Sequence, residues 1–368
     1  MSDQPQGSRI DADTTLFTSF GMVVLDEILI PNRKPLINIL GGSGSYGLGL
    51  ALVATAGARL FLAPPLSRTV AWPIHIGHDF PDPIADLLQS WDIALIVKKE
   101  VDKLSTRGLL EYKDTTFGPK DFKYTTPFLA VAESDVEDTQ VPTSKAYHYL
   151  ATAQDIKGRV STLLAMRRGA GILNRPLVIW EPSPLACNPG NLNEWLEAAE
   201  YVDVLSPNHL ELMKLFSQGS GAAFSRSKIE ELVSTLLDSG VGPDGAGVVV
   251  VRAGEHGCLM QSRDLSPQWL PPFYGSSGIA QEASPVIDPT GAGNAFLGGY
   301  AVGYIQTGDA IQAACYGNIS ASFMLEQIGM PEKSEKGGIE AWNGVSVQTR
   351  LREYMSREDV KRILYYYA

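Results

Sequence analysis

The sequence predicts an α/β fold in which helices cover both faces of a mostly parallel sheet. From about residue 144 onward, short apolar runs alternate with amphipathic stretches of helical length. Such alternation is typical of parallel strands joined by right-handed helical crossovers. Four consecutive valines at 248–251 suit a strand buried on both faces, and a glycine-rich turn at 290–293 leads from an apolar run into a helix. Ligands are therefore expected beyond the carboxyl ends of the strands.

Composition limits the classes of partner. The chain has 368 residues, of which 44% are apolar, so a full core is possible. Its 41 acidic and 30 basic residues give a net charge of −11, which argues against a nucleic-acid surface. The cysteines Cys187, Cys258 and Cys315 lie far apart and match no metal-ligand spacing. They indicate buried or free thiols in a reducing compartment.

One domain is expected at residues 15–368, preceded by a disordered tail at 1–14. The tail is polar and has no signal-peptide pattern. The most apolar window, 48–66, is interrupted by glycine, arginine and two prolines, so it does not resemble a membrane span. We therefore expect a cytoplasmic protein, with the nucleus as a second compatible location, and with neither a membrane nor a nucleic acid as partner.

The most specific motif is the turn at residues 288–294, which reads Asp-Pro-Thr-Gly-Ala-Gly-Asn. Glycines let the backbone turn sharply and approach a ligand closely. A helix that begins directly after them exposes free N–H groups and the positive end of its dipole, which together favour an anion. The expected anion is a phosphoryl group in transfer. The alternative is a tight turn into a buried helix with no ligand.

This turn resembles the C-terminal signature of the PfkB, or ribokinase-like, carbohydrate kinases, usually Asp-Thr-x-Gly-Ala-Gly-Asp-x-Phe. Pro289 replaces the second residue of that pattern, and Asn294 replaces the final Asp. In the family this Asp takes the proton from the substrate hydroxyl, which an amide cannot do at neutral pH. The asparagine form is similar to a fungal, maintenance-of-killer-like branch of the family. From the sequence alone, we expect Asn294→Asp to leave the fold unchanged and to raise turnover.

Two further stretches carry the resemblance. Asn208-x-x-Glu211 reads first as a helix N-cap with its capping-box partner. It also resembles the family's Asn-x-x-Glu motif, whose Glu helps to hold Mg²⁺. Arg252 opens a turn that contains Gly254 and Gly257 and resembles the family's nucleotide-facing turn, where Thr is usual. A simple hairpin turn is the alternative there, and the two readings are compatible.

The resemblance implies a ribokinase-like fold and ATP-dependent phosphorylation of a hydroxyl on a sugar, nucleoside or similar small polyol, with Mg²⁺ and with a rate lowered by Asn294. The implied site residues are catalytic Gly291, Ala292, Gly293 and Asn294; substrate-binding Asp26, Gly41, Gly42 and Asn294; nucleotide-binding Asn208, Arg252, Gly254, Gly257, Thr290 and Asn318; and the metal ligand Glu211. For Asn318, a helix-packing role is equally compatible with the sequence. The alternatives to the enzyme are a pseudokinase that binds nucleotide or metabolite as scaffold or sensor, and an Asn294 introduced to trap a complex.

A small β-sheet is also expected. Between residues 93 and 131, apolar, aromatic and β-branched residues are interleaved with charged ones, as in Phe122, Tyr124 and Thr126. Such period-two patterning predicts strands with one solvated face. Together with residues 26–39, this stretch resembles the β lid that the kinases place over the substrate, which often serves as a homodimer face. A plain surface extension is the alternative. Residues 59–63 are expected to form the strand that follows the first helix.

Overall fold

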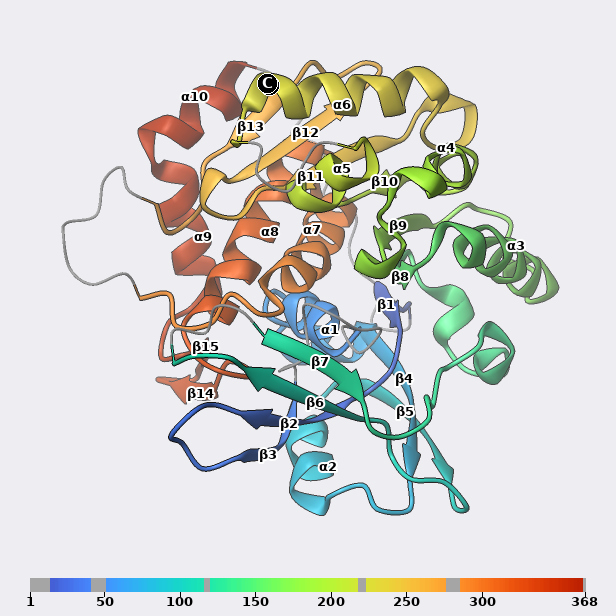
Figure 1. The fold of residues 1–368 in the computed structure, drawn as a ribbon, viewed down its shortest axis with the longest axis vertical. Coiled ribbons are helices and arrows are strands. Elements are labelled where there is room, and N and C mark those ends of the chain that lie inside the picture. The colour runs from blue at the N-terminus through green and yellow to red at the C-terminus, as the bar shows by residue number, and fades with distance from the viewer. Residues whose placement is uncertain (1–13, 41–50, 116–119, 218–222, 276–284, 367–368) are drawn as a thin grey trace, which may run out of the picture.

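The computed structural model describes residues 14–40, 51–115, 120–217, 223–275 and 285–366. Within these ranges the chain forms a nine-stranded sheet, a four-stranded sheet and a β-hairpin, with helices on both faces of the large sheet (Figure 1). The expected α/β class with a mostly parallel sheet is confirmed. The predicted N-terminal tail falls almost entirely outside the described residues, as do Gly41 and Gly42.

The large sheet has the strand order β13-β12-β11-β10-β9-β8-β1-β4-β5, in which all pairs from β11 to β5 are parallel and the β11–β12 and β12–β13 pairs are antiparallel. Its strands are β1 Phe17–Phe20, β4 Val70–Gly77, β5 Ala94–Glu100, β8 Ala146–Ala151, β9 Leu177–Pro182, β10 Val204–Leu205, β11 Val248–Arg252, β12 Cys258–Ser262 and β13 Gln268–Leu270. Successive side chains of a strand enter two separate cores. Val250 packs with one apolar cluster, whereas Val249 and Val251 pack with the other.

Each face of the sheet has its own set of helices. One cluster contains side chains of α1, α7, α8, α9 and α10, and the other contains side chains of α3, α4, α5 and α6. The helices are α1 Ala51–Arg59, α2 Asp82–Gln89, α3 Ala153–Gly169, α4 Leu192–Ala199, α5 His209–Leu215, α6 Arg226–Ser239, α7 Ala292–Thr307, α8 Ala310–Leu325, α9 Val347–Ser356 and α10 Glu358–Tyr366. This double cover is the arrangement that the alternating sequence predicts.

Helix α7 packs against α1 through glycines. A Cβ atom added at Gly298 would overlap the backbone of Ala54 and Ala58, and one added at Gly57 would overlap the backbone of Ala295. The two helix backbones are therefore in direct contact where they cross. Because α7 is buried along most of its length, its N-terminal end is fixed in position relative to the strand ends of the large sheet.

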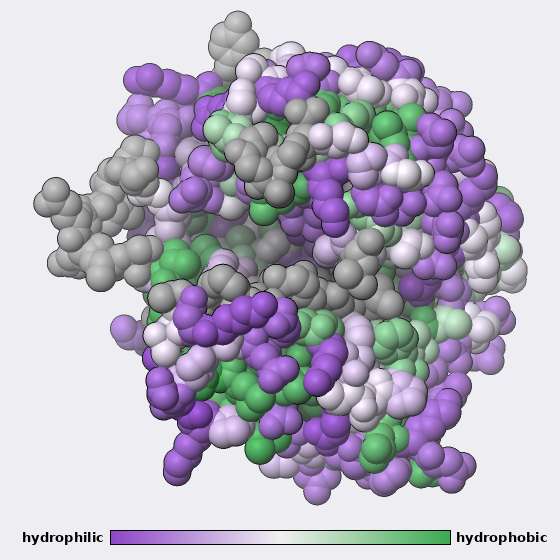
Figure 2. Space-filling model, in the orientation of Figure 1, coloured by the Kyte–Doolittle hydropathy of each residue, from purple (hydrophilic) through white to green (hydrophobic). Residues whose placement is uncertain are grey.

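The second sheet has the strand order β3-β2-β6-β7, formed by β2 Leu25–Leu29, β3 Leu36–Leu40, β6 Arg107–Tyr112 and β7 Lys120–Tyr124. It crosses the lower front of the molecule (Figure 1), and Figure 2 shows this face hollowed between the sheet below and the part that carries α5 and α6 above. The expected boundary at residue 93 was wrong, because β5 pairs with β4 in the large sheet. A role for the small sheet as a lid or homodimer face stays a prediction.

One further difference from the expected elements has a local cause. Residues 59–63 form the end of α1 and the turn after it rather than a strand, because the buried Arg59 guanidinium binds the carboxylate of Glu340 and the carbonyl of Leu62. Residues 331–343 contain the hairpin of β14 Lys333–Lys336 and β15 Ile339–Trp342. Within the described ranges, no helix combines the length and the apolar character that crossing a bilayer requires.

All three cysteines are buried as free thiols. Burial raises the pKa of Cys187 and of Cys258 to about 12, and it also raises the pKa of Cys315. Thiols in this state do not act as nucleophiles or metal ligands at neutral pH. The described residues contain no cluster of His, Cys, Asp or Glu able to hold a metal ion through three or more side chains.

Candidate active site

The glycine-rich turn leads into α7 through a left-handed residue. Oδ1 of Asp288 accepts a hydrogen bond from the N–H of Thr290 at 2.9 Å, which folds the turn back on itself. Gly291 then has φ of +82°, and the first helical residue is Ala292. A Cβ atom at Gly291 would press against Val53 of α1 as well as strain the backbone. The glycine is therefore required both by conformation and by space.

The first turn of α7 keeps a free donor. The N–H groups of Ala292, Asn294 and Ala295 donate to carbonyl groups of the turn. This leaves the N–H of Gly293 without a partner in the described part of the chain. The positive end of the dipole of this 16-residue helix lies at the same place and also attracts an anion. The local geometry is that of an anion site.

Asn294 is held by a buried carboxylate. Its side-chain Nδ2 donates to Oε2 of Glu181, at the end of β9, over 2.5 Å, although the two residues are 113 positions apart. Both side chains are almost fully buried. Because a carboxylate can only accept, the amide must present its nitrogen to Glu181. The Oδ1 atom of Asn294 makes no hydrogen bond within the described ranges, so it remains available as an acceptor.

The other oxygen of Glu181 binds Arg252. The guanidinium Nη1 lies 2.6 Å from Oε1 of Glu181, and Nη2 donates to the carbonyl of Ser206 at 2.9 Å. A Cβ atom at Gly293 would overlap the same Nη1, so the cation lies directly against the first turn of α7. Among the described residues, the buried Nε of Arg252 has no hydrogen-bond partner. Arg252 and Asn294, two of the positions at which the sequence departs from the kinase pattern, thus bind one carboxylate.

A buried chain of polar groups continues from Glu181 into the sheet. Nε2 of His148, on β8, donates to Oε2 of Glu181 at 3.0 Å, and Oγ of Ser19, on β1, lies 2.8 Å from Nδ1 of that histidine. Desolvation opposes the charged form of Glu181, but the Arg252 cation and the His148 hydrogen bond outweigh it. The pKa of Glu181 is therefore lowered, and the carboxyl group is ionised at neutral pH.

The helix N-cap that the sequence predicts at Asn208, with Glu211 as its partner, is present in the structure. The side chain of Asn208 accepts the N–H of Glu211 at 2.8 Å, and Oε2 of Glu211 accepts the N–H of Asn208 at 2.7 Å, which is a complete capping box at the start of α5. Oε2 of Glu211 also lies 3.7 Å from Nη2 of Arg252. Burial raises the pKa of Glu211 to about 7, and the positive charge of Arg252 limits that rise.

A comparison with protein families identifies this architecture. The family model described as "pfkB family carbohydrate kinase" matches residues 129–336, which include β8 to β11 and the whole signature turn. The chain belongs to the pfkB family. The matched range contains β8 to β13 of the large sheet and the glycine turn, whereas the smaller sheet lies before it in the chain.

Relatives and solved structures agree with membership in the pfkB family. An uncharacterised protein of Schizosaccharomyces pombe is 31% identical over 92% of this chain and 92% of its own length. Protein MAK32 of Saccharomyces cerevisiae is 27% identical over 94% of each chain. The structure of an Arabidopsis thaliana ribokinase complexed with ribose and ATP has a TM-score of 0.61 at 15% identity and covers 94% of this chain and 100% of its own. The predicted ribokinase-like fold is thereby confirmed.

The remaining residues implied by the resemblance lie in several places. Asp26 is buried in β2, where its Oδ1 lies against Gly108 of the neighbouring strand. Thr290 is buried in the signature turn. Gly254 and Gly257 both have positive φ in the tight connection between β11 and β12, so the predicted hairpin turn is present. Their roles toward substrate or nucleotide stay predictions.

Asn318 is engaged in packing. Its amide Nδ2 donates to the hydroxyl of Tyr354 at 2.7 Å and to the carbonyl of Pro271 at 3.2 Å, and it lies against the thiol of Cys258. These contacts join α8 to α9 and to the end of β13. The alternative that the sequence offered, a helix-packing amide, is thus seen in the structure, and a contact with nucleotide stays a prediction.

Sequence reasoning missed Glu181, His148 and Ser19. A signal was present for Glu181, because a charged residue that ends the apolar run at 177–180 is placed at the carboxyl edge of a parallel sheet, where ligands bind. No local signal marked Ser19 or His148, which lie within buried strands. Their importance follows only from the register that sets Ser19 beside His148.

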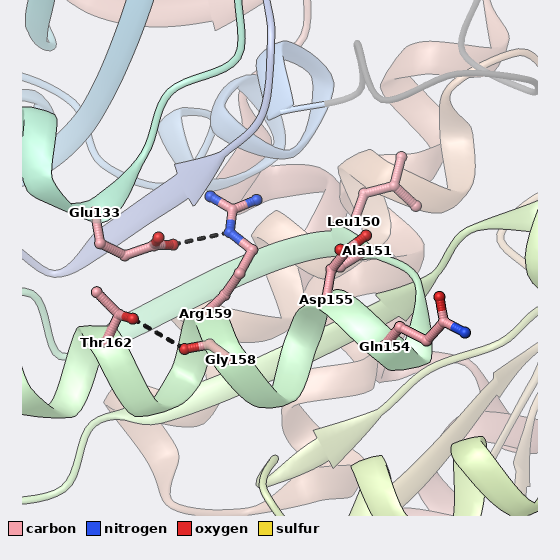
Figure 3. Close-up of a pocket in the computed structure, with 8 residues that line it drawn as sticks. All are labelled: Glu133, Leu150, Ala151, Gln154, Asp155, Gly158, Arg159 and Thr162. Atoms are coloured by element: carbon pink, nitrogen blue, oxygen red, sulfur yellow. Dashed lines mark hydrogen bonds and ion pairs between the residues drawn. The ribbon is translucent and has the colours of Figure 1, made fainter.

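A cavity of about 400 Å³ opens at the carboxyl end of β8, between the first half of α3 and the segment that precedes β8 (Figure 3). Arg159 of α3 points across it and donates to Glu133 at 2.9 Å, while its guanidinium lies over the rings of Phe20 and Tyr149. Leu150 lines the cavity and also packs in a small cluster with Ala295 of α7. Leu150 thus connects the cavity to the signature helix, although no residue of α7 lines the cavity itself. Its lining residues are Glu133, Leu150, Ala151, Gln154, Asp155, Gly158, Arg159 and Thr162.

Proposed function

We propose that this pfkB-family protein transfers a phosphoryl group from ATP to a hydroxyl of a sugar, nucleoside or similar small polyol, with Mg²⁺. The observation that carries the proposal is the first turn of α7. There the N–H of Gly293 has no partner among the described residues, the glycine has no side chain to block a ligand, and the positive end of the helix dipole lies beside the Arg252 cation. Such a donor set suits the charge that develops on a phosphoryl group in transfer. The ribokinase complex with ribose and ATP supports this class of substrate pair.

The residues present fit both implied groups. Anionic phosphate suits the Gly293 N–H and the Arg252 guanidinium, whose buried Nε has no hydrogen-bond partner in the part of the chain that the structure describes. Mg²⁺ prefers few carboxylates and several waters, so the single carboxylate of Glu211 is sufficient beside the phosphates. When bound, Mg-ATP supplies the phosphoryl group and neutralises part of its charge.

Asn294 has a defined part in this proposal. Its Oδ1 accepts a hydrogen bond from the acceptor hydroxyl and so orients it, but it does not remove the proton. A general base contributes about 10²–10⁴-fold to such reactions. The remaining contributions, positioning and electrostatic stabilisation, come from the α7 turn and from Arg252. The proposed enzyme is therefore slow rather than inactive.

The cavity lined by Arg159 and Glu133 supports the acceptor side of the proposal. Its volume of about 400 Å³ lies in the range of small-molecule sites. Its polar groups are held in place, because Arg159 is fixed by Glu133 and by the carbonyl of Val131 at 3.1 Å. We propose that hydroxyl groups of the acceptor bind here, beside Leu150, which also packs with Ala295 of α7.

A second candidate function is favoured by the Asn294 amide itself. Its nitrogen is bound to Glu181, and position 294 offers no carboxylate to activate a hydroxyl. A pseudokinase that binds nucleotide or metabolite as scaffold or sensor would show the same arrangement. Turnover separates the two candidates, because both bind nucleotide and only the enzyme transfers phosphate.

The test is calorimetry with Mg-ATP and Mg-ADP, followed by ATP turnover with a panel of polyols that includes ribose. Binding is expected at micromolar to millimolar concentrations, roughly the range of ordinary substrate affinities. Glu211→Gln should weaken the dependence of binding on Mg²⁺, whereas the matched change Glu197→Gln, on the exposed side of α4, should not. Binding without turnover by any acceptor favours the pseudokinase. Absence of nucleotide binding by the unaltered protein would overturn both.

A further inference from the structure

Two positions that depart from the kinase pattern are linked through one residue that the pattern does not include. Asn294 and Arg252 bind opposite oxygens of the Glu181 carboxylate, at 2.5 Å and 2.6 Å. A negative charge is thus present in the site, but at position 181 and not at position 294. The Arg252 cation balances that charge, so Arg252, Glu181 and Asn294 together are neutral.

We propose that Glu181 is the positioning residue of this site and that residues 181, 252 and 294 act as one charge-balanced unit. Glu181 fixes the direction of the Asn294 amide, with Nδ2 turned inward and Oδ1 turned to the acceptor hydroxyl. The same carboxylate makes position 294 unsuitable for a second one. The role of Glu181 toward the acceptor rests on the proposed function, whereas the coupling of the three side chains does not.

The geometry changes the expectation for Asn294→Asp that the sequence suggests. The new carboxylate would lie where the amide now donates to Glu181, about one hydrogen-bond length away and out of reach of bulk solvent. Two carboxylates at such a distance cannot both ionise and must share a proton. The substitution therefore affects folding as well as catalysis. Its effect on stability is relieved only when Glu181 is also made neutral.

The side chains around Glu181 allow its carboxylate to be exchanged with the amide of Asn294. The groups that face its carboxylate are Arg252 from β11, His148 from β8, Glu211 from α5 and Asn294 from α7. In the exchanged protein, E181Q with N294D, the amide and the carboxylate change places. The amide nitrogen of residue 181 can then donate to the carboxylate of residue 294. Because that nitrogen replaces the oxygen to which His148 now donates, His148 must change tautomer and accept at Nε2. The total charge of residues 181, 252 and 294 stays the same. Neither the new amide at position 181 nor the new carboxylate at position 294 is left without a hydrogen-bond partner.

The experiment compares urea unfolding of four proteins: the unaltered chain, N294D, E181Q and the double variant. At pH 8, N294D should raise the equilibrium constant for unfolding at least tenfold, because the folded protein must take up the proton that the two carboxylates share. The effect should shrink at pH 5, where this proton is taken up at a lower cost in free energy. E181Q leaves Arg252 without its anion and should also raise the constant. The double variant should recover most of the loss. Asn193→Asp, an exposed change of the same kind on α4, should alter the constant by less than about twofold.

Two results would overturn the inference. One is an N294D protein as stable as the unaltered chain at pH 8. The other is a double variant whose loss equals the sum of the two single losses, because independent sites add. These measurements need no substrate, so they can fail or succeed separately from the proposed function.

Turnover provides the readout that distinguishes positioning from a purely structural role. If the chain is a kinase, the double variant should exceed the unaltered protein in kcat by about 10²-fold with little change in KM, because it gains a carboxylate next to the acceptor in a stable site. N294D alone should gain less, since its carboxylate shares a proton with Glu181. A gain in N294D equal to that of the double variant would count against a role for Glu181.

Discussion

The guanidinium of Arg252 lies 2.6 Å from the carboxylate of Glu181, and both groups are almost fully buried. A salt bridge in this setting contributes to stability only while both partners are present, because each charge has lost its water. Replacing Arg252 with threonine, the residue usual in the kinase pattern, should therefore destabilise the protein by about 3–5 kcal/mol. Urea unfolding at pH 7 measures this. Addition of Glu181→Gln should restore part of the loss, and a double variant no more stable than Arg252→Thr would contradict the pairing.

Glu211 should make stability depend on pH near neutrality. Its folded pKa of about 7 is higher than the ordinary value of 4.5. The folded state therefore keeps a proton that the unfolded chain releases. The stability due to this proton is fully present below pH 4.5 and is lost as pH rises through 7. The loss is on the order of 3 kcal/mol at most, from 1.36 kcal/mol per pKa unit.

Glu211→Gln checks this pH dependence, because glutamine cannot ionise. The stability of the variant relative to the unaltered protein should increase between pH 5 and pH 7.5 in urea titrations. Glu197→Gln serves as the control of equal charge change. A constant difference across this pH range would show that Glu211 is already ionised in the folded protein at low pH.

Gly291→Ala should test the left-handed start of α7. Its φ of +82° is unfavourable for an L-residue by about 1–2 kcal/mol, and the new methyl group would also press on Val53. We expect a loss of at least this size in thermal or urea unfolding, together with weaker binding of Mg-ATP. Gly308→Ala is a matched control, because Gly308 has φ of +68° with open space around its Cα. Equal nucleotide binding by both variants would argue against a role of the Gly291 turn in binding.

Arg159→Met should change the affinity for the acceptor more than the rate. The guanidinium borders the proposed acceptor cavity but lies outside the Glu181 unit, so it contributes binding that ground state and transition state share. We expect a KM for the acceptor raised by about tenfold or more, with kcat little changed. Arg168→Met, on the exposed C-terminal part of the same helix, should leave both constants unchanged. A fall in kcat alone would place Arg159 closer to the reacting atoms than we propose.

Local patterns predicted the parts of this site that depend on a few neighbouring residues. The capping box of Asn208 and Glu211 and the glycine turn before α7 both follow from residues three or four positions apart. Period-two patterning also identified strands between 93 and 131, but β5 is an apolar run followed by charged residues and does not alternate as β6 does. The prediction grouped the two strands because they are neighbours in sequence, whereas β5 joins the large sheet. The Glu181 unit joins residues 71 and 113 positions apart. Only the folded chain brings them together.

The reactivity of the three buried cysteines can report local and global unfolding of the protein. Their thiols, with pKa values raised by burial, should react with a maleimide only when local or global unfolding exposes them. Cys187 lies in the loop after β9, a few residues from Glu181, whereas Cys258 lies at the start of β12 and Cys315 within α8. The rates of labelling at the three positions therefore report separately on the edge of the site and on the core behind it. A bound nucleotide should protect Cys187 first.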